Sequence, residues 1–285
     1  SEGYPGMNAL WVEVNPVTPL DTLFLSKTQL EQYHFNNIIR IPFNSSTDRI
    51  NPLLDVTFDG IHILNNDIVS AKPNILIQLK DENQFLALND TADFKVFVQR
   101  PSASLPERVY FGSILSFTPA LLPNNSCKLN YTPTLYEDGI YQLIVQAKDK
   151  SDNQSGAIDY KIKFEVINKA TITEVMNYPN PFSTATHFVF TLTGSEVPTY
   201  FKIQILTITG KVIREITNDE LGLLHVGRNI TDYAWDGKDE FGDQLANGVY
   251  LYRVVTTIRG DDIEKRESGA DPYFKKGFGK MFLIR

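Results

Sequence analysis

The stretch Tyr141-Gln142-Leu143-Ile144-Val145-Gln146-Ala147 decides the fold class of this 285-residue chain. It alternates so that Tyr141, Leu143, Val145 and Ala147 share one predicted face, which is the period-two pattern of a β-strand with a buried side. Comparable stretches recur on both sides of it, and Gly, Pro, Asn and Asp interrupt the chain roughly every ten residues. The sequence therefore predicts an all-β protein made of tandem Ig-like β-sandwich domains.

The other predicted strands fall into two groups along the chain. The first group comprises residues 54–58, 74–79, 94–98, 115–117, 141–147 and 160–167, and the second comprises residues 188–192, 202–205, 211–216, 249–255 and 280–285. Residues 249–255 are apolar on both faces, which predicts a central strand covered on each side. The best helix signal lies at residues 26–33, where Ser26 and Gln29 have the spacing of a capping box.

The length of the chain and the grouping of its strands predict two sandwiches and a shorter leading segment. A chain of 285 residues has room for two or three domains. Residues 1–44 hold too few apolar runs for a core of their own, and we expect them to be the tail of an upstream β-domain. Residues 45–168 and 169–285 are each predicted to form one sandwich. We expect Ser1 to lie within a longer polypeptide or to be a processed end.

Composition excludes several classes of protein. The chain carries 27 Lys and Arg against 34 Asp and Glu, a net charge of −7, and an acidic surface repels phosphate, so nucleic-acid binding is not expected. The single Cys127 excludes an intrachain disulfide and a cysteine-based zinc cluster. No run approaches the ~20 apolar residues of a membrane-spanning helix, so no transmembrane segment is predicted.

One pair of residue types could in principle support nucleophilic catalysis. A thiol needs a nearby base to become a thiolate, and the chain offers only Cys127 with His187 or His225. Both histidines lie in the other predicted sandwich. A small buried hydrophobic residue is the favoured interpretation of Cys127, and we expect this chain not to be an enzyme.

A group of oxygen-bearing side chains is the main metal candidate. Asp149, Asp152 and Asn153 gather in one predicted turn, and Asp81-Glu82 with Asp90 and Asp93 flank another. Hard oxygen ligands in such loops could hold a structural calcium ion. Asp and Asn also favour turns because their side chains bond the local backbone. Ordinary turn chemistry is the favoured interpretation, so no cofactor is expected, with calcium as the alternative.

A second acidic stretch, Asp236-Gly237-Lys238-Asp239-Glu240-Phe241-Gly242-Asp243, is better explained as a turn. Gly237 and Gly242 can supply positive φ angles, and Trp235 just before them is predicted to lie in the core. Asn247-Gly248 is the strongest turn pair in the chain and precedes the strand of Tyr250 and Tyr252. Tyrosines on one strand face can bind sugars, but filling a sandwich core is the favoured use.

Two segments are the candidates for docking. Tyr178-Pro179-Asn180-Pro181-Phe182 restricts the chain sharply because of its two prolines, which fits either a rigid interdomain hinge or a docking feature. The other candidate is the closing strand, Lys280-Met281-Phe282-Leu283-Ile284-Arg285. Ig-like folds expose mainly sheet faces and edges, so we expect recognition through one of these.

An ordered series of motifs in the last 110 or so residues resembles a known family. The series is Asn177-Tyr178-Pro179-Asn180-Pro181-Phe182, then residues 206–214, then Trp235-Asp236-Gly237 with Gly242, then residues 246–253. The terminal residues 279–285 are similar to the closing strand of the same domains. It is similar to the Ig-like domain shared by FlgD-type flagellar hook-capping proteins and the C-terminal sorting domains of type IX secretion cargo. Residues 256–278 form a longer segment than a typical sorting domain has.

The preceding region extends the resemblance to roughly residues 42–285. Residues 51–63 and 121–127 are similar to the region before that domain in PorU-like sortases of the gingipain-type cysteine peptidase family. In that family the peptidase domain lies upstream of such a tail. No residue here matches its catalytic motif, so the resemblance implies no catalytic residue in this chain.

The resemblance implies a non-catalytic C-terminal region of a type IX secretion-associated surface protein of a Gram-negative bacterium. Such a region supports the upstream domains of the same polypeptide and docks to outer-membrane components of the secretion machinery, in the periplasm and at the cell surface. Two alternatives stay open, a sorting domain of a secreted cargo protein and a carbohydrate-binding module of an extracellular enzyme.

Overall fold

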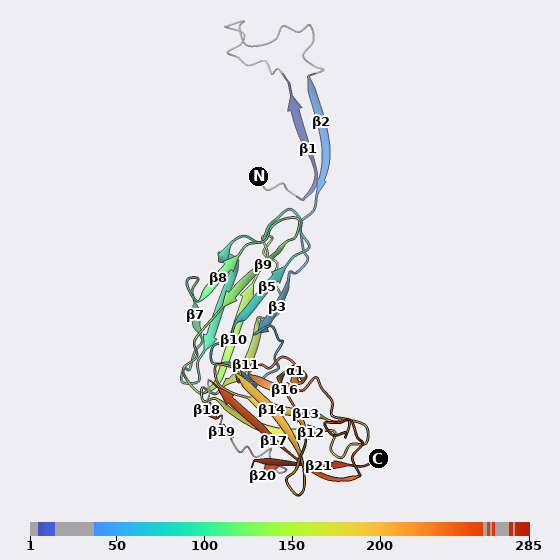
Figure 1. Cartoon of the computed structure of the whole chain (residues 1–285). Helices are drawn as coiled ribbons and strands as arrows, with labels where there is room; N and C mark the ends of the chain where they lie inside the picture. The colour runs from blue at the N-terminus through green and yellow to red at the C-terminus, as the bar shows by residue number, and fades with distance from the viewer. Residues whose placement is uncertain (1–4, 15–36, 259–260, 263, 266–273, 276) are drawn as a thin grey trace, which may run out of the picture. The chain divides into compact units, whose positions relative to one another are not determined.

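The computed structural model describes residues 5–14, 37–258, 261–262, 264–265, 274–275 and 277–285, and nearly all regular structure in them is β (Figure 1). By contacts the chain divides into two units, Ser1–Ile50 and Asn51–Arg285. Two hydrophobic cores lie within the second unit, one for each of two β-sandwiches. The all-β sandwich prediction is therefore confirmed. The helix expected at residues 26–33 lies outside the described residues.

The first unit is an antiparallel two-stranded ribbon of β1 (Gly6–Glu13) and β2 (Ile38–Ser45). β2 runs one residue past the predicted boundary at 44/45. The apolar side chains of the ribbon are largely exposed, Trp11 of β1 and Ile39 of β2 among them. A ribbon of two strands has little core of its own. Its assignment as the tail of an upstream domain stays a prediction.

The first sandwich packs a five-stranded sheet on a four-stranded one. In order across the first sheet lie β4 (Asp67–Val69), β11 (Tyr160–Val166), β10 (Gly139–Ala147), β6 (Phe94–Gln99) and β7 (Glu107–Val109), preceded at β6 by the short 3₁₀ turn η1 (Thr91–Asp93). The second sheet holds β3 (Leu53–Phe58), β5 (Ile75–Lys80), β9 (Ser126–Tyr131) and β8 (Leu115–Thr118). The alternation that defines the fold class is borne out, because Tyr141, Leu143, Val145 and Ala147 are all buried.

The second sandwich pairs another two sheets around its own core. One sheet holds β16 (Gly227–Ile230), β13 (His187–Leu192), β12 (Thr171–Tyr178) and β19 (Glu264–Lys265). The other holds β15 (Val212–Ile216), β14 (Tyr200–Thr207), β17 (Gly248–Ile258), β21 (Phe278–Leu283) and β20 (Phe274–Lys275), with β18 (Asp261–Asp262) paired to β17. A single turn of helix, α1 (Asn218–Leu221), follows β15.

Strand β17 is central in its sheet, as predicted, since it pairs with β14 on one side and β21 on the other. Only one of its faces is fully buried. Tyr250, Tyr252 and Val254 point into the core, whereas Val249 and Leu251 on the other face are half-buried. The expectation that both faces are covered is therefore wrong for the outer face, whose apolar side chains are only half-buried.

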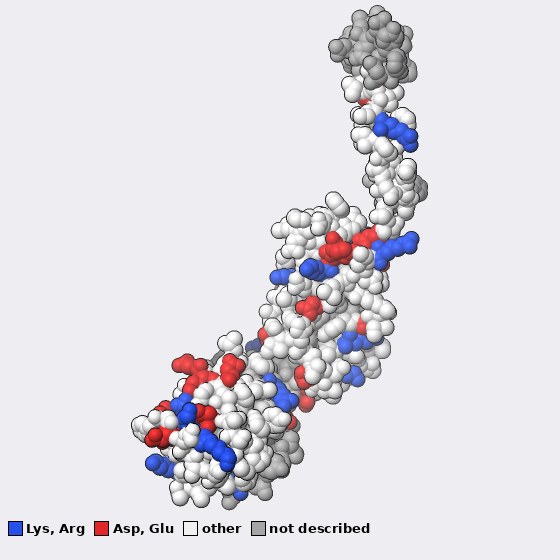
Figure 2. All heavy atoms as spheres, turned by 90° about the vertical axis from the view of Figure 1, so that its right-hand side faces the viewer, with Lys and Arg blue, Asp and Glu red and all other residues white. Residues whose placement is uncertain are grey.

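The charges of the surface are mixed. On the face drawn in Figure 2, acidic and basic side chains are interspersed rather than gathered by sign. In the part of the chain that the structure describes, no helix has the length and apolar character needed to cross a membrane.

Candidate docking site

The two segments predicted for docking meet in the structure, although 100 residues separate Asn180 from Lys280. Residues 178–182, called here the proline segment, follow β12 and lie along the outer edge of β21. Phe182 forms a parallel bridge with Leu283, in which the Phe182 N–H donates to Phe282 O at 3.0 Å and the Ile284 N–H donates to Phe182 O at 2.9 Å. The hinge interpretation is wrong, because the segment lies inside the second sandwich.

Asn180 extends this pairing with its side chain. Its Nδ2 donates to Lys280 O at 3.0 Å, and its Oδ1 accepts the Phe282 N–H at 3.0 Å. One side-chain amide thus takes the place of a residue in a neighbouring strand, because it offers the same donor and acceptor pair as a peptide group. Both X-Pro bonds of the segment, at Pro179 and Pro181, are cis.

The end of β21 is held by two further side chains. Asn247 Oδ1 accepts the Arg285 N–H at 2.9 Å, and Asn247 Nδ2 donates to Arg285 O at 3.1 Å. The Arg285 guanidinium donates to three carbonyl oxygens, of Leu245 at 3.1 Å, Asp236 at 2.6 Å and Gly237 at 3.3 Å. We call the side chains of Asn180, Asn247 and Arg285, with the backbone that they bind, the clamp.

An aromatic cluster lies beneath the clamp. The Trp235 ring is fully buried, with Phe182 at 5.5 Å and Tyr250 at 5.9 Å between ring centroids, and its Nε1 donates to Lys238 O at 2.8 Å. Met281 and Leu283 of β21 are buried in the same core. Gly237 adopts a φ of +75° and Gly242 one of +88° in the turn that follows Trp235, and Gly248 begins β17. The proline segment, the Trp235 turn and the closing strand, which sequence motifs marked separately, are therefore one packed unit.

The outward side of this unit carries the side chains that a partner could contact. Lys280, Phe282 and Ile284 alternate with the buried Met281 and Leu283, and Ile284 is 56% exposed. The Lys280 ammonium lies 5.2 Å from the centroid of the Phe282 ring, a cation–π distance. Nearby along the chain, Tyr178 is 71% exposed, so it does not fix the proline segment to the core as Phe182 does.

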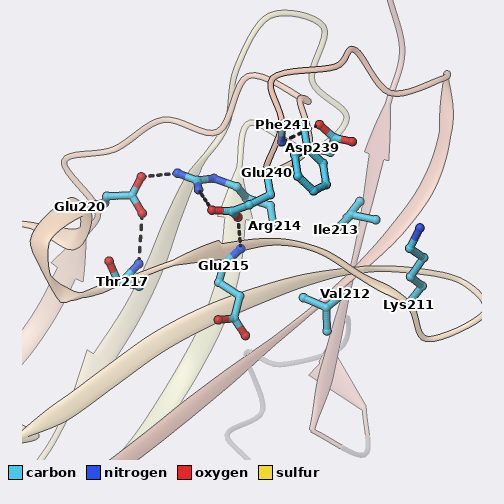
Figure 3. A pocket seen from close by; sticks show the side chains of 10 residues that line it. All are labelled: Lys211, Val212, Ile213, Arg214, Glu215, Thr217, Glu220, Asp239, Glu240 and Phe241. Atoms are coloured by element: carbon cyan, nitrogen blue, oxygen red, sulfur yellow. Dashed lines mark hydrogen bonds and ion pairs between the residues drawn. The ribbon is translucent and has the colours of Figure 1, made fainter.

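At the opposite edge of the same sheet, Glu240 bonds the outer backbone of β15. Figure 3 shows the Arg214 guanidinium between the carboxylates of Glu220 and Glu240, in a pocket of about 460 Å³ beside β15. The Glu240 N–H donates to Ile213 O at 2.9 Å, and Glu240 Oε2 accepts the Glu215 N–H at 3.3 Å. Glu240 thus occupies backbone groups that an added strand would use.

The calcium candidates do not converge on one point. The buried Asp149 carboxylate accepts N–H groups of Ser151 and Asn153 at 2.7 and 2.8 Å, and the Asn153 Nδ2 at 2.7 Å, which is turn chemistry. Asp152 is exposed and pairs with Lys148 instead. The carboxylate that approaches Asp149, within 4.8 Å, belongs to Asp81, which the sequence places among the acidic candidates of another turn. Calcium binding stays a prediction.

Cys127 lies in β9 and is fully buried in the first core. Burial raises the pKa of its thiol to about 11, so the thiol is protonated at neutral pH. His187 and His225 lie in the second sandwich, where His187 Nδ1 contacts Thr231 O at 2.8 Å. The structure therefore does not bring the thiol together with either of these two imidazoles.

The tyrosines considered for sugar binding, Tyr250 and Tyr252, are buried. Other rings are exposed, however, including Tyr110 and Tyr136 in the first sandwich. The sequence placed Gly279 in the closing motif but did not predict its contact: Gly279 lies opposite Tyr252, and a Cβ at this position would lie 1.9 Å from Tyr252 Cζ. The sequence signal for this contact is that Gly279 is the one residue without a side chain in residues 278–283.

Comparisons with known proteins find solved structures that resemble this chain at low sequence identity and low TM-score. No family model matches the sequence, and no curated protein matches it. Dimeric latent PorU from Porphyromonas gingivalis is similar at 16% identity and a TM-score of 0.34, over 86% of this chain and 21% of PorU. The chain thus spans about a fifth of that protein. The FN1–FN3 domains of chicken CNTN1 match at 11% identity and a TM-score of 0.25, over 87% of this chain and 70% of theirs. The fibronectin(III)-like modules of Clostridium thermocellum CbhA match at 13% identity and a TM-score of 0.23, over 75% of this chain and 95% of theirs.

Proposed function

We propose that this chain is a non-catalytic C-terminal β-sandwich region of a type IX secretion-associated, PorU-like surface protein. In this proposal the second sandwich docks the polypeptide to outer-membrane components of the secretion machinery, and the first sandwich joins it to the upstream domains. The docking surface is the outward side of the last strand, with Lys280, Phe282 and Ile284, together with the exposed Tyr178.

The observation that carries the proposal is the convergence of the motif residues on the clamp. The proline segment, the Trp235 turn, Asn247 and residues 280–285 are among the parts of the sequence that resemble sorting-type domains, and these four pack together. A strand held at both ends by side chains presents its outward residues in a fixed geometry, which lowers the entropic cost of binding.

The experiment uses outward substitutions that leave the buried residues in place. Lys280→Glu combined with Ile284→Asp changes the surface but not Met281 or Leu283. We expect surface display in the producing bacterium, measured by protease accessibility on intact cells, to fall roughly tenfold, the effect of about 1.4 kcal/mol in partner binding.

The matched control is Leu223→Asp, which alters a side chain 99% exposed in the same sandwich. It should leave display unchanged, and the unfolding midpoints of both variants should match that of the wild type. Normal display of the Lys280/Ile284 double variant would refute docking through this surface.

A cargo-type sorting domain is the second candidate, favoured by the separate core of the second sandwich. It predicts that residues 169–285, fused to an unrelated periplasmic protein, carry that protein outside the cell and are then cleaved off. Retention of the reporter in the periplasm would refute the cargo role while leaving the docking proposal standing.

A further inference from the structure

The first sandwich has an open groove beside edge strand β7 that the docking proposal does not use. The groove has a volume of about 660 Å³, within the roughly 300–1,000 Å³ typical of ligand sites. Four tyrosines line it: Tyr131 and Tyr141 are buried, whereas Tyr110 and Tyr136 are 71% and 83% exposed. Exposed aromatic faces above a buried aromatic floor are surfaces on which a flat ligand can stack.

Fixed carboxylates supply acceptors at the same groove. Arg100 lies between Glu107, at 2.6 Å, and Glu137, at 3.5 Å. The Ser102 N–H also donates to the Glu137 carboxylate at 3.2 Å, and the Tyr141 hydroxyl bonds the Glu137 backbone. These contacts hold the two carboxylates in place, so hydroxyl groups of a ligand would meet positioned acceptors.

Arg108 supplies a cation to the groove. Its guanidinium lies 5.3 Å from the centroid of the Tyr110 ring. Among the residues that the structure describes, no carboxylate lies within ion-pair distance of Arg108, in contrast to Arg100. A planar guanidinium held against a ring favours a carboxylate, which it can bind through two parallel hydrogen bonds.

We propose that this groove binds an acidic oligosaccharide, with a sugar ring stacked on Tyr136, its hydroxyls donating to Glu107 and Glu137, and its carboxylate paired with Arg108. A sugar satisfies the charged groups while covering the rings. An apolar peptide side chain would instead bury those charges. They would lose their hydrogen bonds to water and gain none from the ligand, which is unfavourable. The chemistry of the groove therefore favours the saccharide over a peptide.

The test measures binding of defined probes to the 285-residue chain by calorimetry. The acidic probes are tetragalacturonate, a glucuronate tetrasaccharide and sialyllactose, the neutral probes are maltotetraose and cellotetraose, and an acidic hexapeptide represents a peptide ligand. We expect at least one acidic saccharide to bind at least tenfold more tightly than either neutral one. Tyr136→Ala and Arg108→Gln should each weaken that binding about tenfold.

Two variants serve as controls. Phe85→Ala removes an 88% exposed ring of the same sandwich outside the groove, and Lys95→Gln removes an exposed cation. Both should bind the acidic saccharide as the wild type does. Binding of no acidic saccharide, equal binding of neutral and acidic ones, preference for the hexapeptide, or unchanged binding by Tyr136→Ala would each overturn the proposal. None of these results bears on docking through the second sandwich.

Discussion

Replacing Asn180 with alanine tests whether the clamp holds the last strand. The substitution removes two hydrogen bonds, one to Lys280 O and one from the Phe282 N–H. A hydrogen bond contributes about 0.5–1.5 kcal/mol net, so their loss costs about 1–3 kcal/mol. The freed backbone groups lie near the surface and can bond water, so we expect a loss of about 1.5 kcal/mol in the free energy of unfolding.

The chain offers a fluorescent probe for this measurement. It has two tryptophans, and Trp235 is the one that lies below the clamp, 5.5 Å from Phe182. In a Trp11→Phe background, Trp235 emission reports on the second sandwich alone. With an m-value of about 2 kcal/mol/M, the urea midpoint of Asn180→Ala should fall by about 0.8 M.

Two further variants sharpen the result. Asn180→Asp keeps the acceptor for the Phe282 N–H but loses the donor to Lys280 O, so it should show at least about half of the loss. Gln244→Ala changes an exposed amide of the same sandwich and should shift the midpoint by less than about 0.25 M, equal to about 0.5 kcal/mol. If the urea midpoint of Asn180→Ala shifted by no more than that of Gln244→Ala, the idea that Asn180 holds the last strand would be refuted.

Three other predictions follow from buried groups. Gly279→Ala places a Cβ against Tyr252 and should cost about 1–3 kcal/mol in chemical unfolding, whereas Gly112→Ala, with open space around its added Cβ, should cost far less. Burial raises the pKa of Cys127 to about 11, so iodoacetamide should label it at about pH 8 only after unfolding in urea; rapid labelling of the folded chain would contradict its burial. Burial lowers the pKa of His225 below 6.5, so the folded state holds fewer protons than the unfolded state just below that pH. Stability should therefore decline as pH falls through about 6.5, and His225→Asn should flatten that part of a urea-midpoint profile recorded from about pH 7.5 to about 5.5.

The sequence predicted strands and buried faces where alternation is strong. The stretch 141–147 keeps its predicted face in the core because side chains of a strand alternate with period two. The prediction of a covered outer face of β17 was wrong. Apolar side chains on a strand can contact neighbours in the same sheet as well as a second layer, so their presence does not by itself indicate a covering layer. Pattern alone does not distinguish these two environments.

The clamp could be predicted in part only. Motifs marked the proline segment and residues 280–285, but no periodic signal shows that Asn180 replaces a strand residue opposite Phe282. That contact depends on chain segments about a hundred residues apart meeting in one register. The role of Glu240 was hidden for the same reason, because its stretch of the sequence is dominated by turn residues.

The two closed edges bear on how the second sandwich could recognise a partner. At β15 the Glu240 backbone and side chain bond the outer edge. Beyond β21 the short β20 pairs with residues 278–279, and the proline segment with Asn180 bonds residues 280–284. A partner that added a strand at either edge would first have to displace these bonds, each worth about 0.5–1.5 kcal/mol. The face of β21 has no such cost, because Lys280 and Ile284 already lie in solvent. Of the two recognition modes expected for an Ig-like fold, the geometry of this sheet therefore favours its face over its edges, and the proposed docking is through side chains.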